Sequence, residues 1–365
     1  MVPETVAGAS LEPVAFSTLA GWQEDDHRAV LDVFVAGCRN APVLRSGLSP
    51  PAALARVCEA ASALVNPERG QARSFFERHF VPLRVSPSGA PGFLTGYFEP
   101  EFPGSTVRTE AFPVPLFGRP HDLVTLDQGV SVPGLPAGFQ AARRRPDGTL
   151  LAYPTRQQID EGEVPGLPIV AWLADETDRF VMQVQGSARL RMADGTVLRV
   201  AYAGRNGHPY TSLGRLLSQQ DAIPPADMTM DRLVARLKGD PAWARRFIWN
   251  NASFVFFRAA PDLDPASGPI GGAGLPLTAH RSVAADRTIW PYGLPIWLDG
   301  TIPTRQRGLT ASLRRLAVIQ DTGSAIVGPA RFDLFFGSGV EAGFVAGLTR
   351  HGVTATILWP RTDPP

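Results

Sequence analysis

The chain has 365 residues, 44% of them hydrophobic, which is enough to bury the core of one large or two ordinary domains. Its 35 Lys and Arg residues nearly balance 34 Asp and Glu residues, so no overall field favours nucleic acid or an anionic membrane as a partner. A ligand of neutral or mixed charge fits better. The 36 Gly and 35 Pro residues predict many turns and short strands, and they argue against a long helical bundle.

The first hundred residues are expected to combine helices with one clear strand. Apolar positions at helical spacing predict a helix over 25–38, and a second apolar helix face carries Cys58. A third short helix is expected at 74–80. It leads into residues 91–100, which read as a strand that ends at a proline.

The two cysteines, Cys38 and Cys58, are too few for a disulfide framework and match no zinc pattern. Each falls on an apolar helix face, so buried free thiols are the first expectation. The alternative is a single bridge between adjacent helices, which would require an oxidising compartment. The six histidines form no i, i+4 pair, and we therefore expect no metal site.

In the middle of the chain the sequence pattern changes to short apolar runs that are broken by Pro and Gly. From about 106 to 205 this pattern predicts an all-β unit, and helices are expected between about 212 and 247. The runs expected to be strands are 112–117, 169–173, 180–184 and 196–202.

The last third of the chain is expected to belong to the same domain as the first hundred residues. Strands are predicted at 253–257, 282–283, 295–298, 316–320 and 354–359, and one helix at 341–351 should end at Gly352. We therefore predict a domain of residues 106–249 inserted into a domain made of 15–105 and 250–365. A ligand cleft would lie between the two.

Two carboxylates twelve positions apart are the strongest chemical signal in the sequence. Asp321 ends a strand-like run, and Asp333 stands among Phe332, Phe335 and Phe336. Burial beside aromatic rings disfavours the charged carboxylate and raises its pKa. A carboxyl group that stays neutral can donate a proton, so we expect the chemistry at Asp333. A purely structural place for Asp333 on a barrel strand is the alternative.

Asp321-Thr322-Gly323 also matches the signature of aspartic proteases, in which two aspartates share one proton. A single-chain protease of this kind needs a second Asp-Thr-Gly or Asp-Ser-Gly loop. The sequence contains neither, and we set this interpretation aside.

Two polar segments of the predicted insert suit the hydroxyl and N-acetyl groups of sugars. They are residues 185–187 (QGS) and 206–212 (NGHPYTS). Gly-Ser and Asn-Gly pairs are also common turn formers, so a turn is the alternative for each segment. Further candidates are Tyr97 and Glu99 to line a cleft, and Trp290 and Trp297 to stack on sugars, although such aromatics usually pack in the core.

Taken together, these segments resemble the membrane-bound lytic murein transglycosylase A family over residues 19–360. The motifs occur in the family's order: 94–100 (LTGYFEP), 184–187 (VQGS), 206–212 (NGHPYTS), 251–257 (NASFVFF) and a C-terminal 3D domain with Asp286, Asp321 and Asp333. The resemblance implies a mainly β fold with some α. A double-psi β-barrel would be formed by both chain ends, with a smaller inserted β-barrel and a substrate groove between them.

The resemblance also implies a reaction, the cleavage of the β-1,4 bond between N-acetylmuramic acid and N-acetylglucosamine with formation of 1,6-anhydromuramic acid. Asp333 would be the catalytic carboxyl group and Asp321 its close neighbour. The implied substrate-binding residues are Thr95, Tyr97, Gln185, Gly186, Ser187, Tyr210, Thr211 and Asp286. No cofactor or metal is implied. The alternatives are a glycan hydrolase that uses both aspartates and a non-catalytic module that binds cell-wall glycans.

The expected partners are the glycan strands of peptidoglycan and complexes of cell-wall synthesis or lysis, and nothing suggests an obligate dimer. Family members are usually outer-membrane lipoproteins that face the periplasm. Residues 1–19 show no secretory leader and no lipid-acceptor cysteine. A periplasmic, outer-membrane-associated location therefore rests on the resemblance alone.

Overall fold

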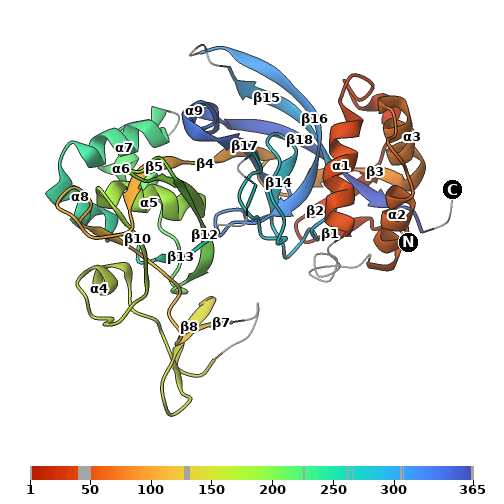
Figure 1. Cartoon of the computed structure of the whole chain (residues 1–365). Coiled ribbons are helices and arrows are strands. Elements are labelled where there is room, and N and C mark those ends of the chain that lie inside the picture. The colour runs from red at the N-terminus through yellow and green to blue at the C-terminus, as the bar shows by residue number, and fades with distance from the viewer. Residues whose placement is uncertain are drawn as a thin grey trace. The chain divides into compact units, whose positions relative to one another are not determined.

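The computed structural model of the chain describes residues 2–39, 51–126, 132–224, 227–260, 263–264, 266–304, 306 and 308–362. The chain divides into two units (Figure 1). Unit 1 consists of Met1–Phe98 and Pro265–Pro365, and unit 2 consists of Glu99–Asp264. The second unit is thus inserted into the chain of the first.

Three helices of unit 1 pack together, α1 (His27–Cys38), α2 (Pro51–Ser62) and α3 (Arg69–His79) (Figure 1). The carboxylate of Asp26 caps α1 by accepting a hydrogen bond from the backbone N–H of Ala29. A disulfide joins Cys38 to Cys58 and so links α1 to α2. The expectation of free thiols is wrong, because the two helix faces bring the Cα atoms within 5.3 Å.

The strands of unit 1 form one sheet that closes on itself. They are β1 (Thr5–Val6), β2 (Ala9–Pro13), β3 (Phe80–Pro87), β4 (Phe93–Glu99), β14 (Ser282–Ala285), β15 (Pro295–Pro303), β16 (Thr310–Asp321), β17 (Arg331–Ser338) and β18 (Arg350–Pro360). Their order is β1-β2-β3-β18-β15-β16-β14-β17-β4, and β4 also pairs with β18. The strands from β18 to β4 therefore close a ring, which confirms the expected barrel built from both ends of the chain.

The two tryptophans that we expected to stack on sugars are buried in two different hydrophobic clusters, Trp290 in the barrel core and Trp297 in the cluster of the N-terminal helices. Trp290 is fully buried and donates its indole N–H to the carbonyl oxygen of Pro329 at 2.9 Å. Trp297 on β15 is 1% exposed and packs against the core of the three N-terminal helices. The sugar-stacking expectation is wrong for both residues, since neither ring face is free.

The late helix ends earlier than its sequence predicts. Helix α9 covers Gly339–Leu348, with Thr349 as its C-cap. Gly352 lies inside β18, where it pairs with Phe93 on β4. The expected glycine cap is wrong because pairing between β18 and β4 extends this part of the chain.

Unit 2 is built around a second sheet, with the strand order β13-β12-β11-β5-β10-β6. These strands are β5 (Glu101–Ser105), β6 (Val114–Phe117), β10 (Ile169–Leu173), β11 (Ser187–Arg191), β12 (Val197–Arg205) and β13 (Val255–Ala259). A bridge between Gly118 and Phe257 connects the chain after β6 to β13, so the two sheet edges meet. A small sheet of β7 (Leu123–Thr125), β8 (Ala141–Arg144) and β9 (Leu150–Leu151) completes the β structure described for this unit.

The helices of unit 2 are α4 (Arg156–Asp160), α5 (Glu176–Gln185), α6 (Leu213–Gln220), α7 (Met230–Lys238) and α8 (Pro241–Ile248). The expected strand at 180–184 is wrong, because these residues lie in α5. Asp175 caps this helix by accepting from the backbone N–H of Asp178 at 2.8 Å. Phe180, Val181 and Met182 are all buried, and a short run that is buried on every side does not distinguish a strand from a helix.

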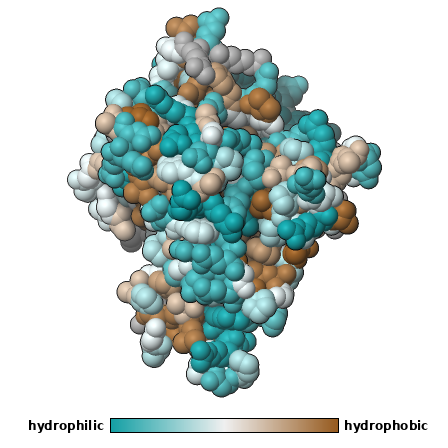
Figure 2. Space-filling view, turned by 90° about the vertical axis from the view of Figure 1, so that its left-hand side faces the viewer, coloured by the Kyte–Doolittle hydropathy of each residue, from teal (hydrophilic) through white to brown (hydrophobic). Residues whose placement is uncertain are grey.

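The surface shown in Figure 2 is mainly hydrophilic, with hydrophobic residues scattered among polar ones. Scattered apolar residues are normal for a folded protein and do not by themselves mark a binding surface. Within the described residues, no helix has the length and apolar character needed to cross a membrane.

Candidate active site

The register of β14 sets the positions of the two sequence-predicted aspartates in unit 1. Ala284 on β14 pairs with Asp321 at the end of β16, in parallel, and with Asp333 on β17, in antiparallel. A register shift after Val283 accompanies the pairing with β16. Asp321 and Asp333 thus lie on either side of the short strand β14. The carboxyl groups are close enough for the charge of Asp321 to raise the pKa of Asp333.

Asp333 is partly buried and accepts a short hydrogen bond. The Thr95 hydroxyl on β4 donates to Oδ1 of Asp333 at 2.6 Å, and Nη2 of Arg331 donates to the Thr95 oxygen at 2.9 Å. Burial is the largest influence and raises the pKa of Asp333 to about 6. The Thr95 hydrogen bond and the Arg331 charge lower this pKa, and Asp321 adds a smaller upward effect. The carboxyl group is therefore able to give up and take back a proton near neutral pH.

Asp321 is held by three donors. Its Oδ1 accepts from the backbone N–H groups of Gly272 at 2.7 Å and Thr322 at 2.9 Å, and its Oδ2 accepts from the Tyr97 hydroxyl at 2.8 Å. Burial raises the pKa of Asp321, while these hydrogen bonds oppose the rise by stabilising the ionised form. A Cβ atom at position 272 would collide with the hydroxyl oxygen of Tyr292, so any other residue here would have to displace that side chain.

The phenols of Tyr97 and Tyr292 lie near the Asp321 carboxylate, and Phe335 packs beside Tyr97. The Tyr97 ring lies 5.3 Å from the ring of Phe335, centroid to centroid. Burial, followed by the charge of Asp321, raises the pKa of Tyr97 well above its usual value, and the same two causes raise the pKa of Tyr292 to about 12. Both phenols therefore keep their protons at neutral pH, and Tyr97 acts as a hydrogen-bond donor.

Asp286, the third aspartate of the segment, is tied up in a turn. Its Oδ1 accepts from the backbone N–H and the hydroxyl of Thr288 at 2.9 and 2.6 Å, and its Oδ2 accepts from the N–H of Gly328 at 2.8 Å. The residue is 6% exposed. These contacts connect the turn after β14 to the loop that precedes β17, a position that supports the barrel.

The other sequence-predicted residues belong to unit 2. Gln185 ends α5, and Gly186 caps that helix in the left-handed region at φ 80°. Ser187 begins β11 and is buried. The backbone N–H of Thr211 donates to Oδ1 of Asn251 at 3.0 Å, and burial raises the pKa of the neighbouring Tyr210.

A buried arginine that we did not single out organises this part of unit 2. Arg156 donates to the carbonyl oxygens of Asn251 at 2.9 Å and Ser253 at 2.5 Å, and to the side-chain oxygen of Gln183 at 2.5 Å. Its partners explain the 251–257 motif as structural. Burial lowers the pKa of Arg156 to about 10, which leaves it charged at neutral pH.

Glu99 is also structural, so the expectation that it lines a cleft is wrong. It is 1% exposed and lies between Arg199 and Arg189, whose nitrogens reach its carboxylate at 2.9 and 2.8 Å. The two arginine partners hold this buried carboxylate in place.

The residues that sequence reasoning missed at the carboxylate site are Arg331, Gly272 and Tyr292. Arg331 lies two positions before Asp333 on the same strand, and alternation along β17 would have placed both side chains on one face. Gly272 and Tyr292 carry no such signal. Among the described residues, no group of three His, Cys, Asp or Glu side chains is placed to hold a metal ion.

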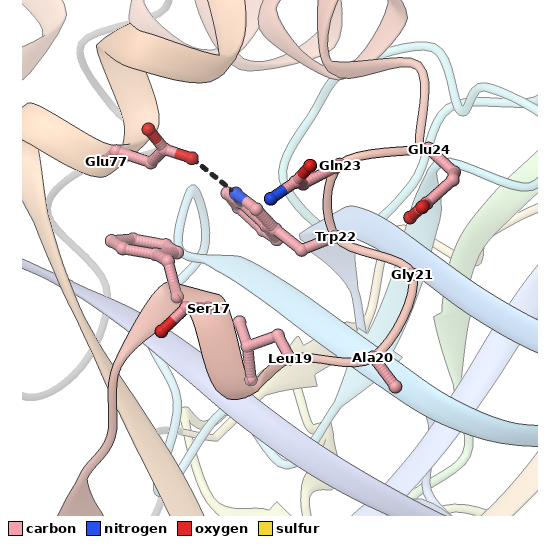
Figure 3. Close-up of a pocket in the computed structure, with 9 residues that line it drawn as sticks. Ser17, Leu19, Ala20, Gly21, Trp22, Gln23, Glu24 and Glu77 are labelled. Carbon is pink, nitrogen blue, oxygen red and sulfur yellow. Dashed lines mark hydrogen bonds between the residues drawn. The ribbon is translucent and has the colours of Figure 1, made fainter.

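A cavity of about 570 Å³ lies elsewhere in unit 1 (Figure 3). It is lined by Phe16, Ser17, Leu19, Ala20, Gly21, Trp22, Gln23, Glu24 and Glu77. The indole N–H of Trp22 donates to Glu77 at 2.9 Å, as the dashed line in Figure 3 shows. This cavity contains none of the sequence-predicted site residues.

The fold and the site define a class of protein in which a closed β-barrel carries a partly buried pair of carboxyl groups and its chain is interrupted by a β-rich unit. Comparison with known families agrees with this architecture. Residues 93–258 match the MltA specific insert domain, and residues 281–359 match the 3D domain. The chain belongs to the membrane-bound lytic murein transglycosylase A (MltA) family.

Similar solved structures cover nearly the whole chain. A membrane-bound lytic murein transglycosylase from Agrobacterium tumefaciens is 35% identical, covers 96% of this chain and 98% of its own, and gives a TM-score of 0.84. MltA from Neisseria gonorrhoeae is 30% identical, covers 100% of this chain and 97% of its own, and gives a TM-score of 0.79.

Curated relatives match over a shorter segment. Membrane-bound lytic murein transglycosylase A from Vibrio cholerae serotype O1 is 35% identical over 205 residues, and the protein of the same name from Escherichia coli K12 has the same identity over the same length. The match spans 54% of this chain and about half the length, 54%, of each of these relatives.

Proposed function

We propose that the chain is a lytic transglycosylase that cleaves the β-1,4 bond between N-acetylmuramic acid and N-acetylglucosamine in peptidoglycan and leaves a 1,6-anhydromuramic end. The observation that carries the proposal is the carboxyl group of Asp333, whose pKa is raised to about 6 beside a second aspartate. The printed names of the relatives support the same reaction and substrate. E. coli MltA, whose likeness at 24% identity concerns the fold, has been solved with bound chitohexaose.

In the first step, the protonated Asp333 gives its proton to the glycosidic oxygen. The bond from this oxygen to the anomeric carbon of the muramoyl unit breaks, and the N-acetylglucosamine leaves with a free 4-hydroxyl group. The Asp333 carboxylate then faces an oxocarbenium-like centre and stabilises its positive charge. A carboxyl pKa near neutrality suits this role, because the same group must be acid and then base.

In the second step, the 6-hydroxyl oxygen of the muramoyl unit attacks its own anomeric carbon. The hydroxyl proton passes to Asp333, which returns to its starting state. No water is consumed, so one carboxyl group is sufficient where an ordinary glycosidase canonically uses two. The nucleophile belongs to the same sugar and therefore has a high effective concentration.

Asp321 supports this cycle in the proposal. Its carboxylate is fixed by Gly272, Thr322 and Tyr97, and its negative charge favours the protonated form of Asp333. The three donors also argue against a hydrolase. Both oxygens of Asp321 are already acceptors, which leaves it poorly suited to orient and deprotonate a water molecule.

The remaining candidates are proposed either to bind the substrate or to support the fold. Thr95 and Tyr97 are part of the carboxylate site itself, so their hydroxyl groups are proposed to contact the sugar. In unit 2, Gln185, Tyr210 and Thr211 are proposed to contact sugar hydroxyl and N-acetyl groups. For Gly186, Ser187 and Asp286, the cap, the buried strand start and the turn give a sufficient structural reason.

We also propose that the protein works outside the cytoplasm, in the periplasm and in association with the outer membrane. The disulfide between Cys38 and Cys58 supports an oxidising compartment. The names of the relatives, which include the word membrane-bound, support the association.

The test is the mass of the products that the purified protein releases from peptidoglycan sacculi. We expect soluble fragments that end in anhydromuramic acid and are one water lighter than hydrolysed fragments. Hydrolysed ends would establish the two-aspartate hydrolase instead. If no soluble fragment appears while the protein still sediments with sacculi, it is a binding module and the proposal fails.

A further inference from the structure

Arg331 is anchored at both ends of its guanidinium group, close to Asp333 on β17. Its Nη1 donates to the carbonyl oxygen of Phe332 at 2.5 Å, and its Nη2 donates to the hydroxyl oxygen of Thr95 at 2.9 Å. The guanidinium carbon also lies 5.4 Å from the centre of the Phe93 ring. A planar group held at three points has little freedom to turn.

This anchoring determines the direction of the Thr95 hydrogen bond. A guanidinium group is a donor only, so the Thr95 oxygen is the acceptor in its contact with Arg331. The hydroxyl group has one proton, which is then directed to Oδ1 of Asp333, 2.6 Å away. Threonine cannot reverse this bond while Arg331 stays in place.

The consequence concerns the two oxygens of Asp333. Because Oδ1 accepts the Thr95 proton in either charge state, a proton on Oδ1 would oppose the hydroxyl proton. The acid proton therefore belongs on Oδ2. Within the described part of unit 1, Oδ2 of Asp333 has no hydrogen-bond partner, which leaves this oxygen available to a substrate.

We propose that Arg331 is a positioning residue that acts through Thr95 and reserves Oδ2 of Asp333 as the oxygen that gives and takes the proton. The inference rests on the proposed function of Asp333. It adds a residue that never needs to touch the sugar, and it assigns different roles to the two carboxyl oxygens.

The charged and titratable groups around Asp333 come from several elements. Tyr97 on β4 and Asp321 on β16 face the site, and Arg350 at the start of β18 acts on Arg331. Strand β14 contributes only Ala284 at this level. Of these groups, Asp321 raises the pKa of Asp333, whereas Thr95 and Arg331 lower it. Loss of either of the last two should raise that pKa.

The experiment compares Thr95→Val, Thr95→Ser, Arg331→Lys and the double variant Thr95→Val with Arg331→Lys. Two readouts are used, the pH profile of anhydro-product release from sacculi and the titration of the Asp333 carboxyl carbon by NMR. A lysine keeps the charge but lacks the planar fork through which two different nitrogens donate to the oxygens of Thr95 and Phe332. In Thr95→Val and in Arg331→Lys we expect the basic limb of the pH–rate profile and the NMR midpoint of Asp333 to move upward by about one pH unit. This is the shift expected when one hydrogen bond to a charged group is lost.

The maximal rate should fall about 10- to 100-fold in Thr95→Val and Arg331→Lys, since the carboxyl group also loses its fixed orientation. Thr95→Ser retains the hydroxyl group and should restore the wild-type limb. The double variant should shift no further than Thr95→Val alone, because both changes break the same chain of contacts. Arg314→Lys, on an exposed residue of β16, is the matched control and should leave the profile unchanged.

A wild-type limb and midpoint in Arg331→Lys would overturn the proposal, because the charge of Arg331 alone would then be sufficient. Additive shifts in the double variant would also overturn it, because Arg331 would then act independently of Thr95. The NMR midpoints separate this outcome from failure of the proposed function. If wild-type protein released no anhydro product, the function would fail, while the midpoints of the four variants would still decide whether Arg331 acts through Thr95.

Discussion

Strand β4 contacts two acidic residues whose surroundings differ, Glu99 at its own end and Asp333, which is hydrogen-bonded to Thr95 of this strand. Glu99, at the end of β4, is 1% exposed and is paired with Arg199 and Arg189 in unit 2. Asp333 in unit 1 is bonded to Thr95 of the same strand, and its raised pKa of about 6 shows that burial outweighs its stabilising contacts. Burial with full ionic pairing fixes a charge, whereas burial with a single hydroxyl donor leaves a group that can exchange a proton.

The largest effect that would sharpen this comparison is the loss of the Asp333 proton. Asp333→Asn should lower the release of anhydro products by about 10³-fold or more, because both oxygens of the neighbouring Asp321 already accept hydrogen bonds and leave it unsuited to replace the acid and base. The release of soluble muropeptides measures the effect. Sedimentation with sacculi should be retained. Asp299→Asn, on a half-buried aspartate of β15, is the matched control, and a similar loss there would show that the assay reports general damage.

The second effect concerns the paired residue. Glu99→Gln should lower the free energy of unfolding by about 3–5 kcal/mol, because it leaves two arginines near a buried site without their carboxylate. Urea denaturation monitored by fluorescence gives the value. The matched change Asp32→Asn removes an exposed partner of Arg28 and should cost no more than about 1 kcal/mol. Equal losses in the two variants would refute the contrast between buried and exposed pairs.

A third, smaller effect tests the bridge between α1 and α2. Replacing both Cys38 and Cys58 by alanine should lower the free energy of unfolding by about 3 kcal/mol, the chain-entropy value for a loop of this order of length. Thermal unfolding with and without a reductant measures the same quantity in wild type. If the reductant leaves the wild-type melting temperature unchanged, the bridge does not form or does not constrain the chain.

The smallest effect is a stability cost of the proposed acid. The folded-state pKa of Asp333, at about 6, lies above the ordinary aspartate value of 3.8. Folding therefore takes up a proton between these pH values, and stability falls as the pH rises through that window. Asp333→Asn removes this penalty and should be about 1–3 kcal/mol more stable than wild type above the window. Below it, the pH dependence of the difference should vanish. A difference that does not change with pH would show that Asp333 ionises normally.

The sequence predicted the central pair because the signal was local. Asp333 stands among three phenylalanines, and the order of motifs in the chain implied which carboxyl group reacts. The partners of Asp321 lay outside such reasoning, since Gly272 and Tyr97 approach it from segments about 50 and 224 positions away. Only the barrel closure brings these segments together.

The wrong predictions have a common cause, which is that burial depends on packing partners. Trp290 and Trp297 have the flat aromatic side chains that stack on sugars in many proteins. Here the barrel core covers Trp290, and the N-terminal helices cover Trp297. In the run at 180–184 the apolar residues Phe180, Val181 and Met182 are consecutive and all buried, so their spacing did not reveal a helix. Gly352 follows a helix but lies within a strand because β4 pairs with it.

The most direct test of the central claim is the titration of the Asp333 carboxyl carbon by NMR in wild-type protein, with Asp333→Asn used to assign the signal. The account predicts a midpoint near 6, far enough from the ordinary aspartate value of 3.8 to keep a usable fraction of the acid at neutral pH. A midpoint at or below the ordinary value would contradict it, because Asp333 would then be ionised at neutral pH and would have no proton to give.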